Sequence, residues 1–339
     1  MKIFKVKHLV ALLVLISLHA CSNDDDGSEP TALEPIPEQI IINDPGLYPT
    51  KFDFDNNTNQ FIAGSLTRSN VGHIDSETGN YEVFVNDDAL ISVTEVYTDE
   101  SRNRLLVSSG DFGVSENSTT ETRLSYAYLG VYNLKTGEKI AGVNLHELMP
   151  ADACVMANGI AVDDDGNIYI VDTYSPVIYK VDGTTYEKSI FISDPRFITP
   201  VSVGKSPGLI GLTYVDGNLI ASKEDEGILF KIPVSNPSGF TEVDGPAFPE
   251  VKGLEITSDG NIALTISGNV TPFSGVKILS SDDNWNTATE VSSFEVLPAE
   301  KFPTNTAVAS DGKLYVINSY LPSAFSGNLM VDFSILLVE

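Results

Sequence analysis

The chain has 339 residues, with 47 acidic side chains against 20 basic ones and a formal net charge of −27. A surface this acidic repels nucleic-acid phosphates and anionic lipid headgroups, which argues against nucleic acid as a partner and limits membrane contact to a local anchor. The two cysteines are Cys21 and Cys154. If Cys21 carries a lipid, no disulfide within the chain is possible, and we expect Cys154 to be a small buried apolar residue.

Residues 1–20 have the pattern of a signal peptide. Lysines near the start precede an apolar run from Leu9 to Leu18, which is too short to span a bilayer. The run ends in Leu18-His19-Ala20-Cys21, which resembles the lipobox of bacterial lipoproteins, although His19 is unusual there. We therefore expect cleavage before Cys21 and lipidation of that cysteine. The alternative is an ordinary secretory signal in which Cys21 stands at this point by chance.

Residues 21–37 are rich in Ser, Asp, Glu and Pro, a composition that favours a flexible acidic tether. Within it, Ser22-Asn23-Asp24-Asp25-Asp26 resembles the acidic tract that sends lipoproteins of the Bacteroidetes group to the outer face of the outer membrane. The resemblance implies an outer-membrane lipoprotein exposed at the cell surface and held to the membrane through its lipid anchor alone. A plain solvated linker is the alternative.

Residues 38–339 contain no long segment with apolar residues at helical spacing. Short runs rich in Val, Ile, Leu and Tyr alternate with Gly, Asn and Asp turns, which indicates an all-β chain. Six similar segments recur about every 50 residues, the length of one propeller blade. Their equivalent apolar positions are Phe61, Leu105, Ile168, Leu219, Ile262 and Leu314. The prediction is a six-bladed β-propeller, closed by pairing the run at 39–42 with the run at 334–338.

A turn sequence accompanies these repeats. Asp163-Asp164-Asp165-Gly166-Asn167 has similar counterparts at Asp216, Asp259 and Asp311. A calcium loop was the other possibility, but the glycine does not stand sixth as in an EF-hand. A turn repeated in several blades is more simply explained as the hairpin between two strands, where Gly and Asn accept positive φ.

The segment Ala157-Asn158-Gly159 and the strand that follows it to Asp172 resemble the regucalcin/gluconolactonase family of six-bladed propellers. Shorter similarities occur at 61–66, 208–212, 252–255 and 280–288, and the branch they resemble most includes plant proteins described as calcium-dependent phosphotriesterase-like. The resemblance implies a divalent metal at the axis, Ca²⁺ or another ion, that polarises a lactone or ester for attack by water.

The repeats place one residue of each innermost strand at the axis, and these residues test the implied metal site. Asn158 alone matches the family's ligands, and Lys252 brings a positive charge to the site, so we expect the metal site to be largely lost. A register shift of one or two residues would instead supply Glu95 or Glu255 as ligands. The six axial positions are Thr50, Thr94, Asn158, Ile210, Lys252 and Thr304.

The loops around the axis should form a polar mouth suited to a small polar or glycan-derived ligand, or to an envelope protein partner. Asp172 is the best-placed carboxylate for a catalytic role, and the two histidines beyond the signal, His73 and His146, are expected in outer turns. The main alternative function is a metal-dependent lactonase or esterase-type hydrolase, and a purely structural module is a third. The expected ligand-binding residues are Thr94, Asn158, Asp172, Lys252, Asn305 and Asn318.

Overall fold

The computed structural model describes residues 35–199, 207–268 and 271–338. The expected signal peptide, the lipidation site Cys21 and nearly all of the tether lie outside the described residues. Residues 36–339 form one compact unit. Within the described ranges, no helix is long and apolar enough to cross a bilayer.

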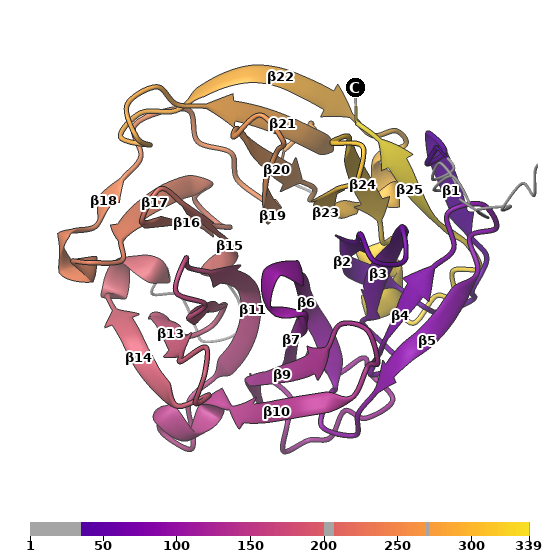
Figure 1. The fold of residues 1–339 in the computed structure, drawn as a ribbon, viewed down its shortest axis with the longest axis horizontal. Helices are drawn as coiled ribbons and strands as arrows, with labels where there is room; N and C mark the ends of the chain where they lie inside the picture. Colours follow the sequence, from indigo (N-terminus) through magenta and orange to yellow (C-terminus); the bar gives the residue numbers. More distant parts are fainter. Residues whose placement is uncertain (1–34, 200–206, 269–270, 339) are drawn as a thin grey trace, which may run out of the picture. The chain divides into compact units, whose positions relative to one another are not determined.

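Six antiparallel sheets form a ring around a common axis, as Figure 1 shows, so the predicted six-bladed β-propeller is confirmed. From the axis outward, blade 1 consists of β2 (Pro49–Asp55), β3 (Gln60–Ser65), β4 (Asn70–Ile74) and β5 (Tyr81–Asn86). Blade 2 consists of β6 (Ser92–Asp99), β7 (Arg104–Gly110), β9 (Tyr128–Asn133) and β10 (Lys139–Asn144). Blade 3 consists of β11 (Val155–Val162), β12 (Ile168–Asp172), β13 (Val177–Val181) and β14 (Lys188–Ser193). Blade 4 consists of β15 (Leu209–Val215), β16 (Asn218–Lys223), β17 (Ile228–Pro233) and β18 (Thr241–Glu242). Blade 5 consists of β19 (Val251–Ile256), β20 (Ile262–Ile266), β21 (Gly275–Ser280) and β22 (Thr289–Glu295). Blade 6 consists of β23 (Pro303–Val308), β24 (Leu314–Asn318), β25 (Phe333–Leu337) and β1 (Gln39–Ile42).

A few short elements lie outside this pattern. The two-residue strand β8 (Ser125–Tyr126) pairs parallel with β11. The five-residue helix α1 (Leu321–Phe325) follows β24. Single turns of 3-10 helix occur at η1 (Glu100–Arg102), η2 (Leu145–Leu148), η3 (Pro195–Phe197), η4 (Pro237–Gly239) and η5 (Ala299–Lys301).

The ring closes by joining the two ends of the propeller in blade 6. Strand β1 pairs antiparallel with β25, with Gln39 opposite Leu336 and Ile42 opposite Phe333. Figure 1 shows the indigo β1 beside the yellow β25 at the rim. This confirms the predicted closure, with the C-terminal strand beginning at Phe333 rather than Ser334. Closure stabilises the ring because a sheet edge that would otherwise be open is paired.

The repeated Asp-Gly turns are hairpins, as predicted. Gly166, Gly217, Gly260 and Gly312 have φ between +78° and +86°, in the left-handed region that glycine enters without steric cost. Each lies between the first and second strands of its blade. The turn therefore fixes the register of the two strands next to the axis.

The core lies between neighbouring sheets. Phe197, which leads into blade 4, packs against Phe230 of β17 with ring centroids 5.4 Å apart, in a cluster that also contains Tyr169 of blade 3. The six apolar residues that define the sequence repeat all lie on second strands and are all buried, namely Phe61, Leu105, Ile168, Leu219, Ile262 and Leu314. Each blade is thus stabilised by apolar contact with its neighbours around the ring.

Two smaller predictions are wrong. Cys154 is a partly exposed free thiol, because it lies in the loop before β11 rather than within the strand. His73 lies in β4, where its Nε2 is 3.2 Å from an Asp55 carboxylate oxygen, whereas an outer turn was expected. His146 lies in η2.

The closing strand offers a direct test of its contribution to stability. Ile42 is fully buried in β1, whereas the adjacent Ile41 is 37% exposed. We expect Ile42→Ala to lower the free energy of unfolding by about 2–5 kcal/mol, because it leaves a cavity at the joint between the two chain ends. The matched variant Ile41→Ala should stay within about 0.5 kcal/mol of the parent in denaturant titration. Equal losses for the two variants would show that β1 adds little to the closed ring.

Candidate ligand-binding site at the centre of the propeller

All six innermost strands carry the same irregularity where they enter the sheet. In each blade the pairing between the first and second strands contains a β-bulge, one extra residue on the inner strand. A bulge redirects the side chains at that point, and here it turns them toward the axis. The bulges fall at the six predicted axial positions, Thr50, Thr94, Asn158, Ile210, Lys252 and Thr304.

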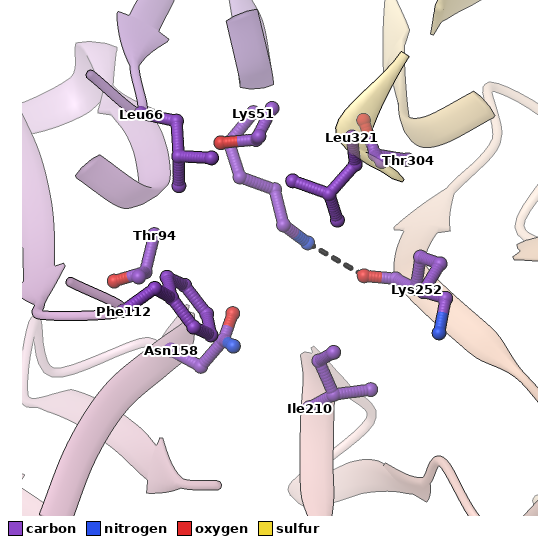
Figure 2. Close-up of a pocket in the computed structure, with 10 residues that line it drawn as sticks. Lys51, Leu66, Thr94, Phe112, Asn158, Ile210, Lys252, Thr304 and Leu321 are labelled. Atoms are coloured by element: carbon purple, nitrogen blue, oxygen red, sulfur yellow. Dashed lines mark hydrogen bonds between the residues drawn. The ribbon is translucent and has the colours of Figure 1, made fainter. Parts of the chain in front are cut away.

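These six residues line one small cavity of about 50 Å³ on the axis, which we call the axial pocket. Figure 2 labels five of them, Thr94, Asn158, Ile210, Lys252 and Thr304, around the pocket. Three apolar side chains, Leu66, Phe112 and Leu321, complete the lining together with Lys51. The structure thus brings together Thr94, Asn158 and Lys252 of the expected ligand-binding residues.

The sequence analysis did not identify Lys51 as a site residue. Its side chain crosses the central channel of the propeller, the space around the axis that the six innermost strands surround (Figure 2). Its Nζ donates a hydrogen bond to the Lys252 carbonyl oxygen at 2.7 Å and lies 3.3 Å from Glu95 Oε2. The residue is 5% exposed. The fixed positive charge that was expected from Lys252 is therefore supplied at the axis by Lys51, and the Lys252 ammonium instead pairs with Glu224.

The positions that correspond to Lys51 in blades 3, 4 and 5 are glycines. At Gly253, an added Cβ would lie 2.4 Å from Asn305 Oδ1 and 3.0 Å from the Thr304 carbonyl oxygen. At Gly159, it would lie 2.6 Å from the Ile210 carbonyl oxygen. These glycines let neighbouring inner strands approach each other closely.

Two polar atoms of the axial pocket have no hydrogen-bond partner in the structure. They are Asn158 Oδ1 and Thr304 Oγ1, on residues that are each 3% exposed. By contrast, Thr50 Oγ1 donates to the Val93 carbonyl oxygen and Thr94 Oγ1 to that of Ala157, so those hydroxyl groups link successive blades. Buried polar atoms are normally paired. Both residues line the axial pocket, so hydrogen-bonding capacity that other groups of the protein do not use lies beside it.

The axial pocket adjoins a larger cavity of about 400 Å³, which we call the mouth cavity. The two share five lining residues, and most of the additional lining is apolar. Among the described lining residues, Glu224 is the one carboxylate, and it pairs with Lys252. Burial raises the pKa of the Tyr174 hydroxyl to about 12. The lining consists of Phe112, Arg123, Leu124, Asn158, Thr173, Tyr174, Pro207, Ile210, Glu224, Lys252, Phe302, Leu321 and Phe325.

Asp172 and Asn318 end the second strands of their blades and line neither cavity. The fully buried Asp172 carboxylate accepts hydrogen bonds from the backbone amides of Met156, Tyr174 and Ser175 and from the Tyr179 hydroxyl. Burial raises the pKa of Asp172 to about 6, and these hydrogen bonds oppose the shift. Asn318 is also fully buried, and its Nδ2 donates to Ser334 Oγ. These placements make both residues anchors of strand ends.

The opposite end of the channel holds three carboxylates around a cavity of about 30 Å³, the lower pocket. Burial raises the pKa of Asp53 to about 6 and also raises the pKa values of Glu95 and Glu255. Asn305, expected at the mouth, lines this lower pocket, and its Nδ2 donates to the Phe52 carbonyl oxygen. The Lys51 ammonium lies at the Glu95 end of the group.

The residues of the axial pocket do not fit a divalent cation. Such an ion requires an oxygen-rich shell with carboxylate charge, whereas this pocket offers one amide oxygen, three hydroxyl groups and two lysines. The substitute ligands Glu95 and Glu255 line the lower pocket, beside the Lys51 ammonium. Within the described residues, no group of three or more His, Cys, Asp or Glu side chains is arranged to hold a metal ion.

Comparisons with known proteins support the propeller architecture but assign the chain to no family. No protein-family model matches the chain, and no curated protein matches it by sequence. Among solved structures, the Malassezia sympodialis allergen Mala s 1 is 19% identical, with 90% of this chain and 97% of that chain covered and a TM-score of 0.63. A luciferin-regenerating enzyme is 11% identical (88% and 95% covered, TM-score 0.57), and a streptogramin B lyase is 13% identical (89% and 97% covered, TM-score 0.53). At these identities the likeness establishes a propeller shared by proteins of varied function, and the regucalcin/gluconolactonase resemblance stays a prediction.

The lower pocket predicts an unusual pH dependence of stability. Carboxylates with raised pKa values bind protons more tightly in the native state, so their contribution is present below about pH 4 and is lost as the pH rises through about 6. Glu255 and Asp53 repel each other. We therefore expect Glu255→Gln to raise the free energy of unfolding at pH 7 by on the order of 1 kcal/mol and to flatten its fall as the pH rises through the raised pKa of Asp53, about 6. Denaturant titrations across that range measure both effects. The exposed Glu187→Gln, with the same charge change, should follow the parent, and an unchanged slope in Glu255→Gln would refute the assignment.

The axial chemistry also predicts the response to metal ions. In chelator-treated protein, we expect Ca²⁺, Mg²⁺, Mn²⁺ and Zn²⁺ to leave the melting temperature unchanged, because a ligand of the native state must raise it. Calorimetric titration run in parallel should show no saturable site. A one-site isotherm that Asn158→Ala abolishes would instead support the metal-dependent hydrolase.

Proposed function

We propose that this chain is a binding protein that captures a small molecule at the centre of its propeller and carries it on a lipid-anchored, surface-exposed domain. The observation that carries the proposal is the pair of unpartnered buried atoms, Asn158 Oδ1 and Thr304 Oγ1, which face a pocket continuous with the mouth cavity. A ligand hydroxyl or amide group donates to Asn158 Oδ1 and hydrogen-bonds to the Thr304 hydroxyl.

The size and lining of the mouth cavity favour a small molecule over a protein. Its volume of about 400 Å³ falls within the range of about 300–1,000 Å³ usual for small-ligand sites. Such sites combine apolar walls with a few placed polar groups, which is the composition found here. Phe112, Tyr174 and Phe302 supply apolar wall, and the axial pocket supplies the polar groups.

The same lining favours binding over hydrolysis. General-base catalysis needs a titratable group within reach of the reacting atoms. Glu224 is held by Lys252, Asp172 is enclosed by its own hydrogen bonds, and the raised pKa keeps Tyr174 protonated at neutral pH. The described lining contains no histidine. These groups are therefore suited to binding a ligand and not to catalysing its hydrolysis.

The route of the chain into the propeller suits a surface receptor. Leu337 N donates to the Glu38 carbonyl oxygen, at the end of β25 remote from the cavities. The axial residue Thr304 lies at the other end, where Pro303 pairs with Asn318. The described residues 36–38 therefore enter the propeller on the face opposite the mouth. With Cys21 in a membrane, this connection lets the mouth open away from the lipid.

Thr304→Val separates binding from folding. It removes an unpartnered buried hydroxyl at nearly constant volume, so the melting temperature without ligand should be unchanged or higher. For a ligand found by thermal shift in a panel of sugars, sugar acids and small aromatic acids, we expect affinity to fall about 10-fold by calorimetry. The full chain purified in detergent serves for both measurements.

Thr306→Val is the matched control. Thr306 lies two residues along the same strand, and its buried hydroxyl is likewise unpartnered but faces neither cavity. It should show the same thermal behaviour with undiminished affinity. Equal affinity of the parent and Thr304→Val for every ligand found would place recognition elsewhere and overturn the proposed site.

A further inference from the structure

Arg123 differs from every other arginine of this chain. The sequence contains five arginines, all of them within the described residues. Four make ion pairs with aspartates, whereas the structure gives the Arg123 guanidinium no ion pair or hydrogen bond, although acidic residues outnumber basic ones more than two to one. The four pairs are Arg68 with Asp44, Arg102 with Asp99, Arg104 with Asp99, and Arg196 with Asp194.

The backbone around Arg123 is held in place by a buried carboxylate. Asp111 is fully buried, and its side chain accepts hydrogen bonds from Gly113 N, Ser118 Oγ and Thr122 Oγ1. The Asp111 carbonyl oxygen accepts from Leu124 N. The residues on both sides of Arg123 are therefore fixed to one anchor. The loop thus fixes the backbone at Arg123, and the exposed side chain extends from this anchored backbone at the edge of the mouth cavity.

The space beside the guanidinium depends on the absence of a side chain. Gly113 has φ +81°, and a Cβ added there would lie 2.8 Å from Arg123 Nε. The glycine thus permits the turn and leaves room for the guanidinium. Arg123 lines the mouth cavity together with Asn158 and the aromatic rings of Phe112 and Phe302.

Among the described residues that line the mouth cavity, one positive charge is unmatched. Lys252 and Glu224 neutralise each other through their ion pair, and Arg123 has no counterpart among these described residues. The planar guanidinium matches a carboxylate through two parallel hydrogen bonds. A single unmatched charge suits a monoanion, and the apolar walls suit a ring or short hydrocarbon body.

We propose that Arg123 is the anion-recognising residue of the mouth cavity and that the ligand is a small organic acid, with its carboxylate on Arg123 and its apolar body against the aromatic wall. This inference rests on the proposed function, because it names the chemical class that the binding site selects. It also assigns a role to a loop residue remote in sequence from every axial position.

The test compares acids with their neutral counterparts on the full chain purified in detergent. The probes are benzoate, phenylacetate and cinnamate, each paired with its primary amide and titrated calorimetrically up to about 5 mM, which detects a Kd near 1 mM. We expect at least one acid to bind at least 10-fold more tightly than its amide. Arg123→Gln should remove that preference and leave amide binding unchanged, and Arg123→Lys should restore part of it.

Arg102→Gln is the control for the loss of one positive charge. Arg102 lies in η1, between the far ends of β6 and β7, and lines neither the mouth cavity nor the axial pocket. It should retain the full preference for acids. Equal binding of acids and amides, or an acid preference that survives Arg123→Gln, would overturn the inference while the proposed binding function stands. Failure of every acid to bind would also overturn it. The proposed binding site is tested separately, by the affinities of the parent and Thr304→Val for any ligand of the panel.

Discussion

One buried ammonium group ties three inner strands together across the axis of this propeller. Lys51 belongs to β2 of blade 1, its ion-pair partner Glu95 lies on β6 of blade 2, and the carbonyl oxygen that it contacts belongs to Lys252 on β19 of blade 5. A charge this buried is tolerated only when it is paired and hydrogen-bonded, and both conditions hold here. The contact fixes the width of the channel and divides it into a neutral upper part and an acidic lower part.

This division explains why the upper and lower parts of the channel differ in charge. Above Lys51 the axial pocket presents hydroxyl, amide and apolar groups, and its charges are compensated. Below it, three carboxylates share a single ammonium, and their pKa values rise because burial and mutual repulsion both disfavour the charged form. A divalent cation would compete with Lys51 for the same space. The Lys51 ammonium thus takes the place of an axial metal cation. The polar groups of the axial pocket that have no partner are suited to hydrogen bonds with an organic ligand.

The architecture could be predicted because it depends on repeated local signals. The Asp-Gly turns, the apolar residue after each turn and the two terminal strands lie within short segments, so sequence spacing alone aligned the six axial residues. Lys51 could not be found this way, because its contacts with Glu95 and the Lys252 carbonyl oxygen join strands that are far apart in the sequence. Asp172 and Asn318 were placed at the mouth because they end strands, whereas their full burial depends on the neighbouring loops. The tether and lipidation site stay predictions, since they lie outside the described residues.

Two segments outside the repeat line the mouth cavity. Phe112 and Arg123 belong to the insertion between β7 and β9, and Leu321 and Phe325 to the segment between β24 and β25. These two segments contact each other over the channel, with the Phe112 and Phe325 rings 5.7 Å apart in an edge-to-face arrangement. In the binding role proposed above, the rigid ring would fix where a ligand sits and these loops would select it, since loops on a fixed scaffold can change without loss of the core. Propellers of this degree of likeness can therefore share the ring and differ in function, because function depends on the residues placed on the fold.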